Sequence, residues 1–456
     1  MSPPASGAGR AVLATVALGA ILAPLNSTMI AVALPRIVDD LHTSVGTAGW
    51  LVTSYLLALA VVQPPAGKLG DRYGRRPFVL GGLFVFGLGS LGAALAPGLG
   101  FLIAFRLVQA VSGAVLFPNG IGLIRETIPA ARRGRALGLV GACLSLAAGL
   151  GPPLGGLILS LGGWRSIFWV NVPLVAAALA IAWRTVPHRT AKPPPTPFDW
   201  LGSILLALLL SGTAGLVVEG RHAPVALLPG IPLLVIVGLV FVRRELTHHD
   251  PVIQLRFFAR RAFGAANGAI ASSNLAFYTL LLATPILLSR HLHWSSLRIG
   301  LALALLSIPM VVFSPLGGQL ADRHGRRLPA VIGCSLLTIG LVPLAVQPGL
   351  ATFALCVCLV ASGAGVGLSI AGLQASAIEA VDLDQAGVAA GIFSTCRYIG
   401  SFAGSIALAR LLDGAHGLTG FRAVFAMTLV GAAVSVVATL ALPSRPVARS
   451  HRQARG

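Results

Sequence analysis

The sequence predicts an all-α integral membrane protein with fourteen transmembrane helices, arranged as two six-helix bundles with two extra helices between them. Three observations support this class. Hydrophobic residues form 56% of the chain and charged residues only 10%, whereas soluble domains carry about 25% charged residues. Apolar runs long enough to cross a hydrocarbon layer of about 30 Å recur along the whole chain. A short charged motif also occurs twice, at matching places in the two halves.

The expected spans follow the apolar runs in order. The first run comes after a single Arg10 and is longer than the apolar core of a signal peptide, so we expect it to be retained as a span. The first six spans are expected at 11–34, 47–66, 78–97, 100–123, 137–160 and 164–184. The two extra spans are expected at 200–219 and 225–243, and the last six at 262–288, 298–316, 328–347, 350–379, 386–411 and 420–442.

The duplicated motif divides the chain into two halves. GKLGDRYGRR, from Gly67 to Arg76, recurs as GGQLADRHGRR from Gly317 to Arg327, with D-R-x-G-R-R in common. The copies begin 56 and 55 residues after the start of the first and the ninth expected span. Such repeats are typical of transporters built from two related bundles. The expected domains are a tail at 1–10, a six-helix bundle at 11–184, a linker with two spans at 185–261, a second bundle at 262–442 and a basic tail at 443–456.

The distribution of basic residues predicts the orientation of the chain in the membrane. Of the 33 Lys and Arg residues, 24 fall in one set of alternating loops and tails, 7 in the other set, and 2 within spans. Basic loops accumulate on the cytoplasmic side. We therefore expect both termini in the cytoplasm.

Each copy of the motif is expected to form a tight turn between two helices. Gly74 and Gly325 can adopt backbone angles that other residues resist. Asp71 and Asp322 are expected near the start of the following helix, where the helix dipole favours an anion. Arginines that pair with these acids would make each loop a conformational latch; a signal for topology alone is the alternative, which the repetition disfavours. The latch residues are Gly67, Asp71, Arg72, Gly74, Arg75, Arg76, Asp322, Arg323, Gly325, Arg326 and Arg327.

Further motifs lie within the expected spans. The fourth span carries RLVQAVSG from Arg106 to Gly113, and the first carries LNSTMIAVALP from Leu25 to Pro35. The fifth span carries Gly149, Gly151, Pro152, Pro153, Gly155 and Gly156 in GLGPPLGG. Glycines and prolines weaken a helix and let backbones approach closely, which suits a helix that bends during transport; fixed packing is the alternative.

Together with the duplicated loop, these motifs resemble those of the major facilitator superfamily. The resemblance runs from about residue 11 to 442 and is specifically to the fourteen-span drug:proton antiporters of the quaternary-ammonium and multidrug exporter type. Trp50 and Tyr55, and the segment from Trp164 to Pro173, fit the same branch. The resemblance implies export of small molecules by alternating access in exchange for protons, with an exporter-type fifth span. One departure is Asn26, since the family usually has an acid at this position.

Polar and aromatic residues within the spans are candidates for the substrate cavity. As a set they indicate a weakly polar cavity with aromatic surfaces, suited to amphipathic or cationic molecules; singly, each is equally compatible with helix packing. They are Asn26, Tyr55, Gln63, Asn119, Asn274, Tyr278, Gln374 and Tyr398. The candidates for proton coupling are Arg106, Gln109, Glu219, Glu379 and Arg397. Arg106 and Arg397 are charges within apolar runs, which usually face a water-filled cavity or a partner, with pairing to helix carbonyls as the alternative.

Other classes of function are disfavoured. The net charge of +20 is spread over short loops rather than gathered on one face, so no nucleic-acid partner is expected. His248 and His249 are interpreted as part of a solvated loop, and the five cysteines as packing residues, so no metal is expected. A membrane-embedded enzyme would need converging His, Asp or Glu side chains within the spans, and none of the 13 acids lies at the middle of one.

The expected function is therefore a non-enzymatic exporter of hydrophobic or amphipathic small molecules, driven by the proton gradient without a cofactor. A dedicated exporter or uncoupled carrier of one native metabolite is the alternative, favoured by Asn26. The expected surroundings are the lipid bilayer of a bacterial plasma membrane, because the abundance of Ala, Arg and Gly suggests a genome rich in G and C. The expected oligomeric state is a monomer.

Overall fold

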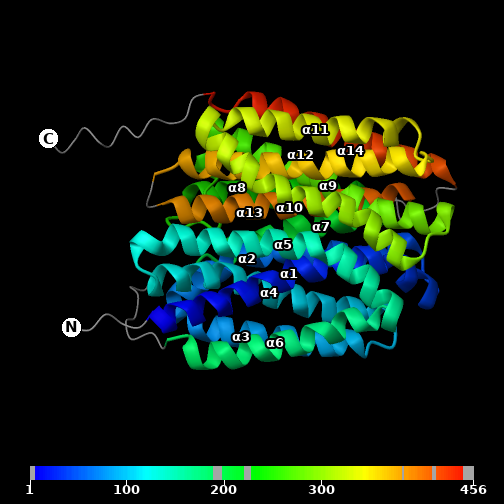
Figure 1. The fold of residues 1–456 in the computed structure, drawn as a ribbon. Helices are drawn as coiled ribbons and strands as arrows, with labels where there is room; N and C mark the ends of the chain where they lie inside the picture. Colours follow the sequence, from blue (N-terminus) through cyan, green and yellow to red (C-terminus); the bar gives the residue numbers. More distant parts are fainter. Residues whose placement is uncertain (1–5, 188–197, 220–226, 383–384, 413–416, 445–456) are drawn as a thin grey trace, which may run out of the picture. The chain divides into compact units, whose positions relative to one another are not determined.

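The computed structural model describes residues 6–187, 198–219, 227–382, 385–412 and 417–444. In these ranges the regular structure is helical throughout, with fourteen α-helices and one short 3-10 helix, Leu255–Ala259. The first eight helices are α1 (Ser6–Asp40), α2 (Val45–Tyr73), α3 (Arg75–Ala94), α4 (Leu99–Thr127), α5 (Ala130–Gly162), α6 (Arg165–Thr185), α7 (Trp200–Glu219) and α8 (Leu227–Thr247). The last six are α9 (Arg261–Leu292), α10 (Ser296–His324), α11 (Arg327–Val346), α12 (Thr352–Glu379), α13 (Ala386–Leu412) and α14 (Leu418–Leu440) (Figure 1).

The helices confirm the predicted fold class. Each of the fourteen expected spans overlaps one of them, and among the described residues twelve are long and apolar enough to cross a membrane. The other two carry several charges: α8 has Arg243, Arg244 and Glu245 near its end, and α13 has Arg397 and Arg410. The domain boundaries expected from the repeat stay predictions.

The chain forms two compact units, of which the first comprises residues 1–253, 281–304 and 405–414. In this unit α1 packs against α4, α5 and α6, and α3 packs against α4 and α6 (Figure 1). Buried apolar side chains fill the space between them, among them Val12, Leu83, Phe86, Leu123 and Val175. This core holds α1 and α4, which carry Asn26 and Arg106, in place against α3 and α6.

The second unit comprises residues 254–280, 305–404 and 415–456, and in it α11 packs against α12 and α14. The α11–α12 contact is made by glycines. A Cβ placed on Gly333 would lie 2.4 Å from the carbonyl oxygen of Gly365, and one on Gly340 would lie 2.6 Å from Ser362 Oγ. Because neither position has room for a side chain, the two backbones approach more closely than other residues would allow.

The duplicated loops turn at their glycines. Gly74 has a φ of 90° and Gly325 a φ of 86°, both in the region that glycine adopts readily. The expected positions of the two acids were wrong. Asp71 lies in the last turn of α2 and Asp322 in the last turn of α10, rather than at the start of the next helix. The helices continue past the acids because nothing interrupts them before the glycine, and an arginine four residues later pairs with each acid.

Candidate functional site

A buried arginine connects three helices of the first unit. The Arg106 side chain, on α4, is completely buried, and its Nη1 donates a hydrogen bond to Asn26 Oδ1 on α1. Its guanidinium carbon lies 4.0 Å from the centre of the Tyr55 ring on α2. Tyr55 in turn donates from its hydroxyl to the carbonyl oxygen of Ala23, at 3.4 Å. An amide oxygen and the face of an aromatic ring therefore stabilise a cation inside an apolar run.

Gln109 lies on the same helix but binds a different neighbour. Its Nε2 donates to Ser90 Oγ on α3 at 2.7 Å, and Ser90 donates to the carbonyl oxygen of Phe86 at 2.9 Å. A Cβ on Gly89 would lie 2.9 Å from Gln109 Cγ, so α3 and α4 are close at this point. The structure thus places Gln109 in the contact between two helices.

Five buried amide side chains of the first unit retain polar atoms without a hydrogen-bond partner among the described residues. The atoms are Asn26 Nδ2, Gln63 Oε1, Gln109 Oε1, Asn119 Oδ1, and both Oδ1 and Nδ2 of Asn171. Most buried polar groups in proteins are hydrogen-bonded, so these atoms are suited to bind water or a ligand. Asn119 also has a packing role, since its Nδ2 donates to the carbonyl oxygen of Ala66 at 3.1 Å.

The second unit holds the other polar candidates. Arg397 and Tyr398 are neighbours on α13, with the guanidinium carbon 5.1 Å from the centre of the ring. Asn274 Nδ2 donates to the carbonyl oxygen of Ile270 on its own helix, at 3.2 Å. Tyr278 stacks edge to face with Phe277, and Gln374 is exposed on α12. The structure thus brings Asn26, Tyr55 and Arg106 together in one unit, and Arg397 and Tyr398 in the other.

The two motif loops contain matching ion pairs. In the first copy Arg75 pairs with Asp71 and, at 2.8 Å, with Glu126 on α4. In the second copy Arg326 pairs with Asp322 at 2.5 Å and with both carboxylate oxygens of Glu379 on α12, at 2.6 and 3.2 Å. Glu379 first, and then Asp322, raise the pKa of Arg326 above its ordinary value. Glu126 was not among the residues predicted from the sequence, although its 51-residue separation from Arg75 nearly matches the 53 residues between Arg326 and Glu379.

The remaining loop arginines differ in their surroundings. Arg76 donates to the carbonyl oxygens of Val186 and Trp183, the latter at 2.9 Å, and so satisfies the end of α6. Arg72 lies 5.6 Å from the ring of Tyr73, Arg323 is exposed, and Arg327 opens α11. Gly67 lies against Pro118 of α4, where a Cβ would be 3.3 Å from the proline Cβ.

The glycines of α5 lie against two other helices. A Cβ on Gly151 would overlap Thr28 of α1, at 1.8 Å from its Oγ1, and one on Gly155 would lie 3.1 Å from Met29 Cα. On Gly156 it would lie 2.9 Å from Gly300 Cα of α10. Gly149 is buried, and Pro152 and Pro153 lie inside the helix. The motif therefore produces close backbone contacts on more than one side of α5.

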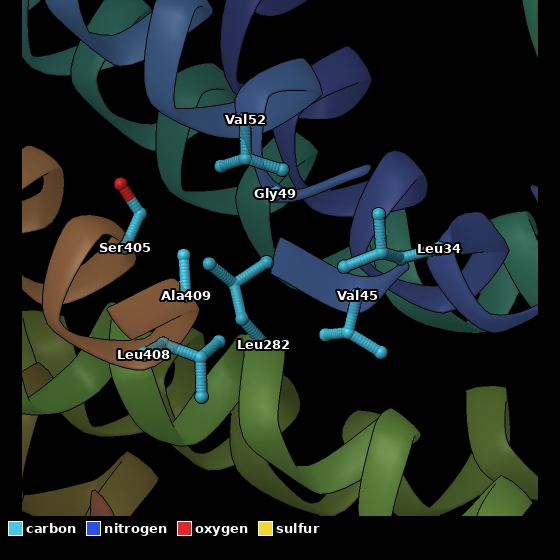
Figure 2. A pocket seen from close by; sticks show the side chains of 8 residues that line it. All are labelled: Leu34, Val45, Gly49, Val52, Leu282, Ser405, Leu408 and Ala409. Carbon is cyan, nitrogen blue, oxygen red and sulfur yellow. The ribbon is translucent and has the colours of Figure 1, made fainter. Parts of the chain in front are cut away.

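A small apolar hollow lies elsewhere in the first unit (Figure 2). Its lining residues are Leu34, Val45, Gly49, Val52, Leu282, Ser405, Leu408 and Ala409. Ser405 Oγ is hydrogen-bonded to Thr53 Oγ1 at 3.1 Å in a buried position. None of the predicted cavity residues lines this hollow, which holds no titratable side chain.

The sequence matches the model of the Major Facilitator Superfamily over residues 16–261 and 266–456. The chain belongs to the major facilitator superfamily. It is 36% identical to the uncharacterized MFS-type transporter YvkA of Bacillus subtilis, over 93% of this chain and 95% of that protein. It is 31% identical to the multidrug resistance protein Stp of Mycobacterium tuberculosis, over 88% of this chain and 75% of that protein. It is 28% identical to the riboflavin transporter RibZ of Clostridioides difficile, over 86% of this chain and 85% of that protein.

The fold is also that of solved membrane transporters. The crystal structure of a D-xylose-proton symporter superposes with a TM-score of 0.68 at 16% identity, covering 95% of this chain and 98% of that one. As a member of this superfamily, the protein is a multi-pass membrane transporter with a small-molecule substrate.

One cluster of buried charged side chains in this major facilitator protein was not predicted from the sequence. Asp199, just before α7, accepts a hydrogen bond from Arg244 Nε on α8 at 3.0 Å, and Glu245 is buried beside them. The loop 248–251, interpreted from sequence as solvated, is attached to α2 through Lys68 and Asp250.

Among the described residues no group of three or more His, Cys, Asp or Glu could hold a metal ion. The side chain of the coupling candidate Glu219 lies outside the described residues.

Proposed function

We propose that the protein is a secondary active exporter of hydrophobic or amphipathic small molecules, including drugs and antibiotics, working by proton antiport with alternating access. The observation that carries the proposal is the buried cluster of Arg106, Asn26 and Tyr55. Charged residues inside transmembrane helices usually mark substrate or ion pathways. An aromatic ring and amides with spare hydrogen-bonding atoms suit amphipathic organic molecules. The similarity to a multidrug resistance protein supports the same substrate class.

The energy source and setting complete the proposal. The proton gradient drives export, and no cofactor takes part. The protein works as a monomer in a bacterial plasma membrane, with both termini in the cytoplasm, as the excess of basic residues in alternating loops indicates. The ion pairs of Arg75 and Arg326 act as latches that form in one conformation and break in the other.

A second candidate is a carrier for one native metabolite that is not tightly coupled to protons. The specific observation in its favour is the amide at Asn26, which holds Arg106 without being an acid. A coupled carrier needs a group whose proton affinity changes between states, usually a partly buried carboxylate. A relative named as a riboflavin transporter fits this candidate as well as the first.

Transport by the purified full-length chain in liposomes distinguishes the candidates. Lipophilic cations and neutral drugs are offered under an imposed pH gradient, and uptake is measured before and after the gradient is collapsed. Uptake that stops on collapse supports antiport, whereas uptake that ignores the gradient supports the uncoupled carrier. Absence of transport for every compound argues against the multidrug proposal.

Substitution of Arg106 tests the site itself. Arg106→Ala removes a hydrogen bond to a charged group, worth about 1.5–3 kcal/mol, so we expect a loss of transport of about ten- to a hundredfold. Arg422→Ala, at an exposed arginine of α14, is the matched control and should transport normally. An Arg106→Ala protein that is folded and fully active would exclude this cluster as the transport site.

A further inference from the structure

Two buried acids lie at the open end of the α7–α8 hairpin, where α7 begins and α8 ends. This end is called the foot of the hairpin and is defined by Asp199, Gly202, Arg244, Glu245 and His248. Asp199 immediately precedes α7 and is 1% exposed, and Glu245 lies near the end of α8 and is 2% exposed. Both lie outside the expected spans 200–219 and 225–243. Acidic side chains are almost never fully buried unless they are paired, because loss of water strongly disfavours the charged form.

Asp199 has the surroundings of a charged carboxylate. Its Oδ1 accepts hydrogen bonds from the backbone amide of Gly202 at 2.9 Å and from Arg244 Nε at 3.0 Å. The first of these bonds makes Asp199 the N-cap of α7, where the helix dipole also favours an anion. Both donors and the helix dipole therefore favour negative charge at this position.

The remaining oxygens of the two acids face the same point. Asp199 Oδ2 and Glu245 Oε1 are both buried without a hydrogen-bond partner among the described residues. A Cβ placed on Gly202 would lie 2.5 Å from Asp199 Oδ2 and 2.7 Å from Glu245 Oε1. The bare Cα of Gly202 thus leaves room for two carboxyl oxygens, which would repel each other if both groups were ionised.

The neighbouring basic side chains do not bind Asp199 Oδ2 or Glu245 Oε1 through a hydrogen bond. His248 Nδ1 lies 3.8 Å from Asp199 Oδ2, but it accepts a hydrogen bond from the backbone amide of Asp250 at 3.2 Å, so it presents a lone pair and not a proton. Arg244 binds the other oxygen of Asp199. Lys68 of α2 binds Asp250 Oδ1 and, at 2.6 Å, the carbonyl oxygen of Pro251.

We propose that Asp199 and Glu245 form a proton-binding site, in which a proton on Glu245 Oε1 is shared with Asp199 Oδ2. The other oxygen of Glu245, Oε2, accepts a hydrogen bond from the backbone amide of Ile253 at 2.7 Å, which leaves Oε1 as the hydroxyl. Burial above all, together with the charge of Asp199, raises the pKa of Glu245 from 4.5 to about 7, although the Ile253 amide, Lys68 and Arg244 act in the opposite direction.

The proton-binding site is linked along the chain to the first copy of the duplicated motif, whose Lys68 lies in α2. The segment that leaves α8 runs from Glu245 to Asp250 and Pro251, which hold Lys68 of the first motif copy. The closed foot binds the proton more tightly than an opened, hydrated foot, in which Glu245 would regain a pKa near 4.5. Closure is therefore favoured at low pH, and this contribution is lost as the pH rises from about 4.5 through about 7. Deprotonation loosens the hairpin foot and its attachment to α2.

Infrared difference spectroscopy of the full-length protein in lipid nanodiscs tests the site without any substrate. We expect a protonated-carboxyl band that disappears with a midpoint near pH 7. The band should be absent from Glu245→Gln and unchanged in Asp39→Asn, an exposed acid of α1. In Asp199→Asn the midpoint should fall, because a neighbouring negative charge is removed. A wild-type protein without the band, a band that survives in Glu245→Gln, or a midpoint unmoved in Asp199→Asn would overturn the proposal.

Hydrogen–deuterium exchange tests the mechanical consequence. After correction for the intrinsic pH dependence of amide exchange, the opening of residues 245–255 should increase by about tenfold or more between pH 5.5 and 8 in the wild type. In Glu245→Gln the opening should be independent of pH, since a neutral side chain stands there at every pH. Equal pH dependence in both proteins would refute the link between the proton and the foot. Because neither measurement involves transport, the result does not depend on the proposed function.

Discussion

Replacement of Gly156 by alanine should disturb the crossing of α5 and α10. A Cβ at this position would lie 2.8 Å from the carbonyl oxygen of Ser296 and 2.9 Å from Gly300 Cα. In the opposite direction, a Cβ on Gly300 would lie 2.9 Å from Gly156 Cα and 2.9 Å from the carbonyl oxygen of Pro152. All of these neighbours are backbone atoms, which cannot rotate away as a flexible side chain would. The helices must therefore separate to admit a single methyl group.

The expected cost follows from two opposing effects. Forcing an extra methyl group into a packed contact costs about 1–3 kcal/mol, while alanine in place of glycine within a helix gains about 1 kcal/mol. Gly141 of the same helix is exposed, and a Cβ there would meet nothing within 4 Å. Gly141→Ala therefore shows the gain alone. We expect Gly156→Ala to be less stable than Gly141→Ala by about 1–3 kcal/mol.

Denaturation of the purified protein in detergent measures this difference. Unfolding can be followed by the reaction of a thiol-specific dye with the buried cysteines Cys334 and Cys358. Gly156→Ala combined with Gly300→Ala should cost more than the two single changes together, because both methyl groups compete for the same space. If Gly156→Ala proved as stable as Gly141→Ala, the close crossing of α5 and α10 would be refuted.

Two further predictions concern hydrogen bonds and ion pairs. Arg326→Ala removes the contacts with Asp322 and Glu379 and should destabilise the protein by about 1 kcal/mol in the same denaturation assay. Arg323→Ala, at an exposed arginine, should change stability little. Equal effects of the two substitutions would contradict the ion pairs of Arg326. A double-mutant cycle of Thr53→Val and Ser405→Ala should give a coupling of about 1 kcal/mol, since the two hydroxyls share a buried hydrogen bond, and additive effects would exclude that bond.

The helical fold was predictable because membrane spans are specified locally. An apolar run of sufficient length requires a helix, whose backbone groups satisfy each other, and Gly74 and Gly325 indicated where two of the turns occur. The positions of Asp71 and Asp322 were not predictable in the same way. A charged motif between two apolar runs does not reveal whether an acid closes the first helix or opens the second, since both ends face water.

The candidate site was predictable in its residue types and only partly in its contacts. Asn26 and Arg106 were both notable in the sequence, but they are 80 residues apart, and their hydrogen bond depends on the packing of α1 against α4. Asp199 lies just before the first helix of a hairpin and Glu245 near the end of the second, and each by itself resembles an ordinary acid beside a membrane span. Only the folding of α7 onto α8 brings their oxygens to the bare Cα of Gly202.

The composition of α13 has a consequence for how the chain enters the membrane during synthesis. Arg397 lies eleven residues after the start of this helix, near its middle, and α13 is not among the twelve helices that are apolar enough to span a membrane on their own. An arginine at the centre of a span opposes insertion from the translocation channel by about 2.5–3.5 kcal/mol. Helices synthesised earlier must therefore assist the insertion of α13, so the last part of the protein depends on correct assembly of what precedes it.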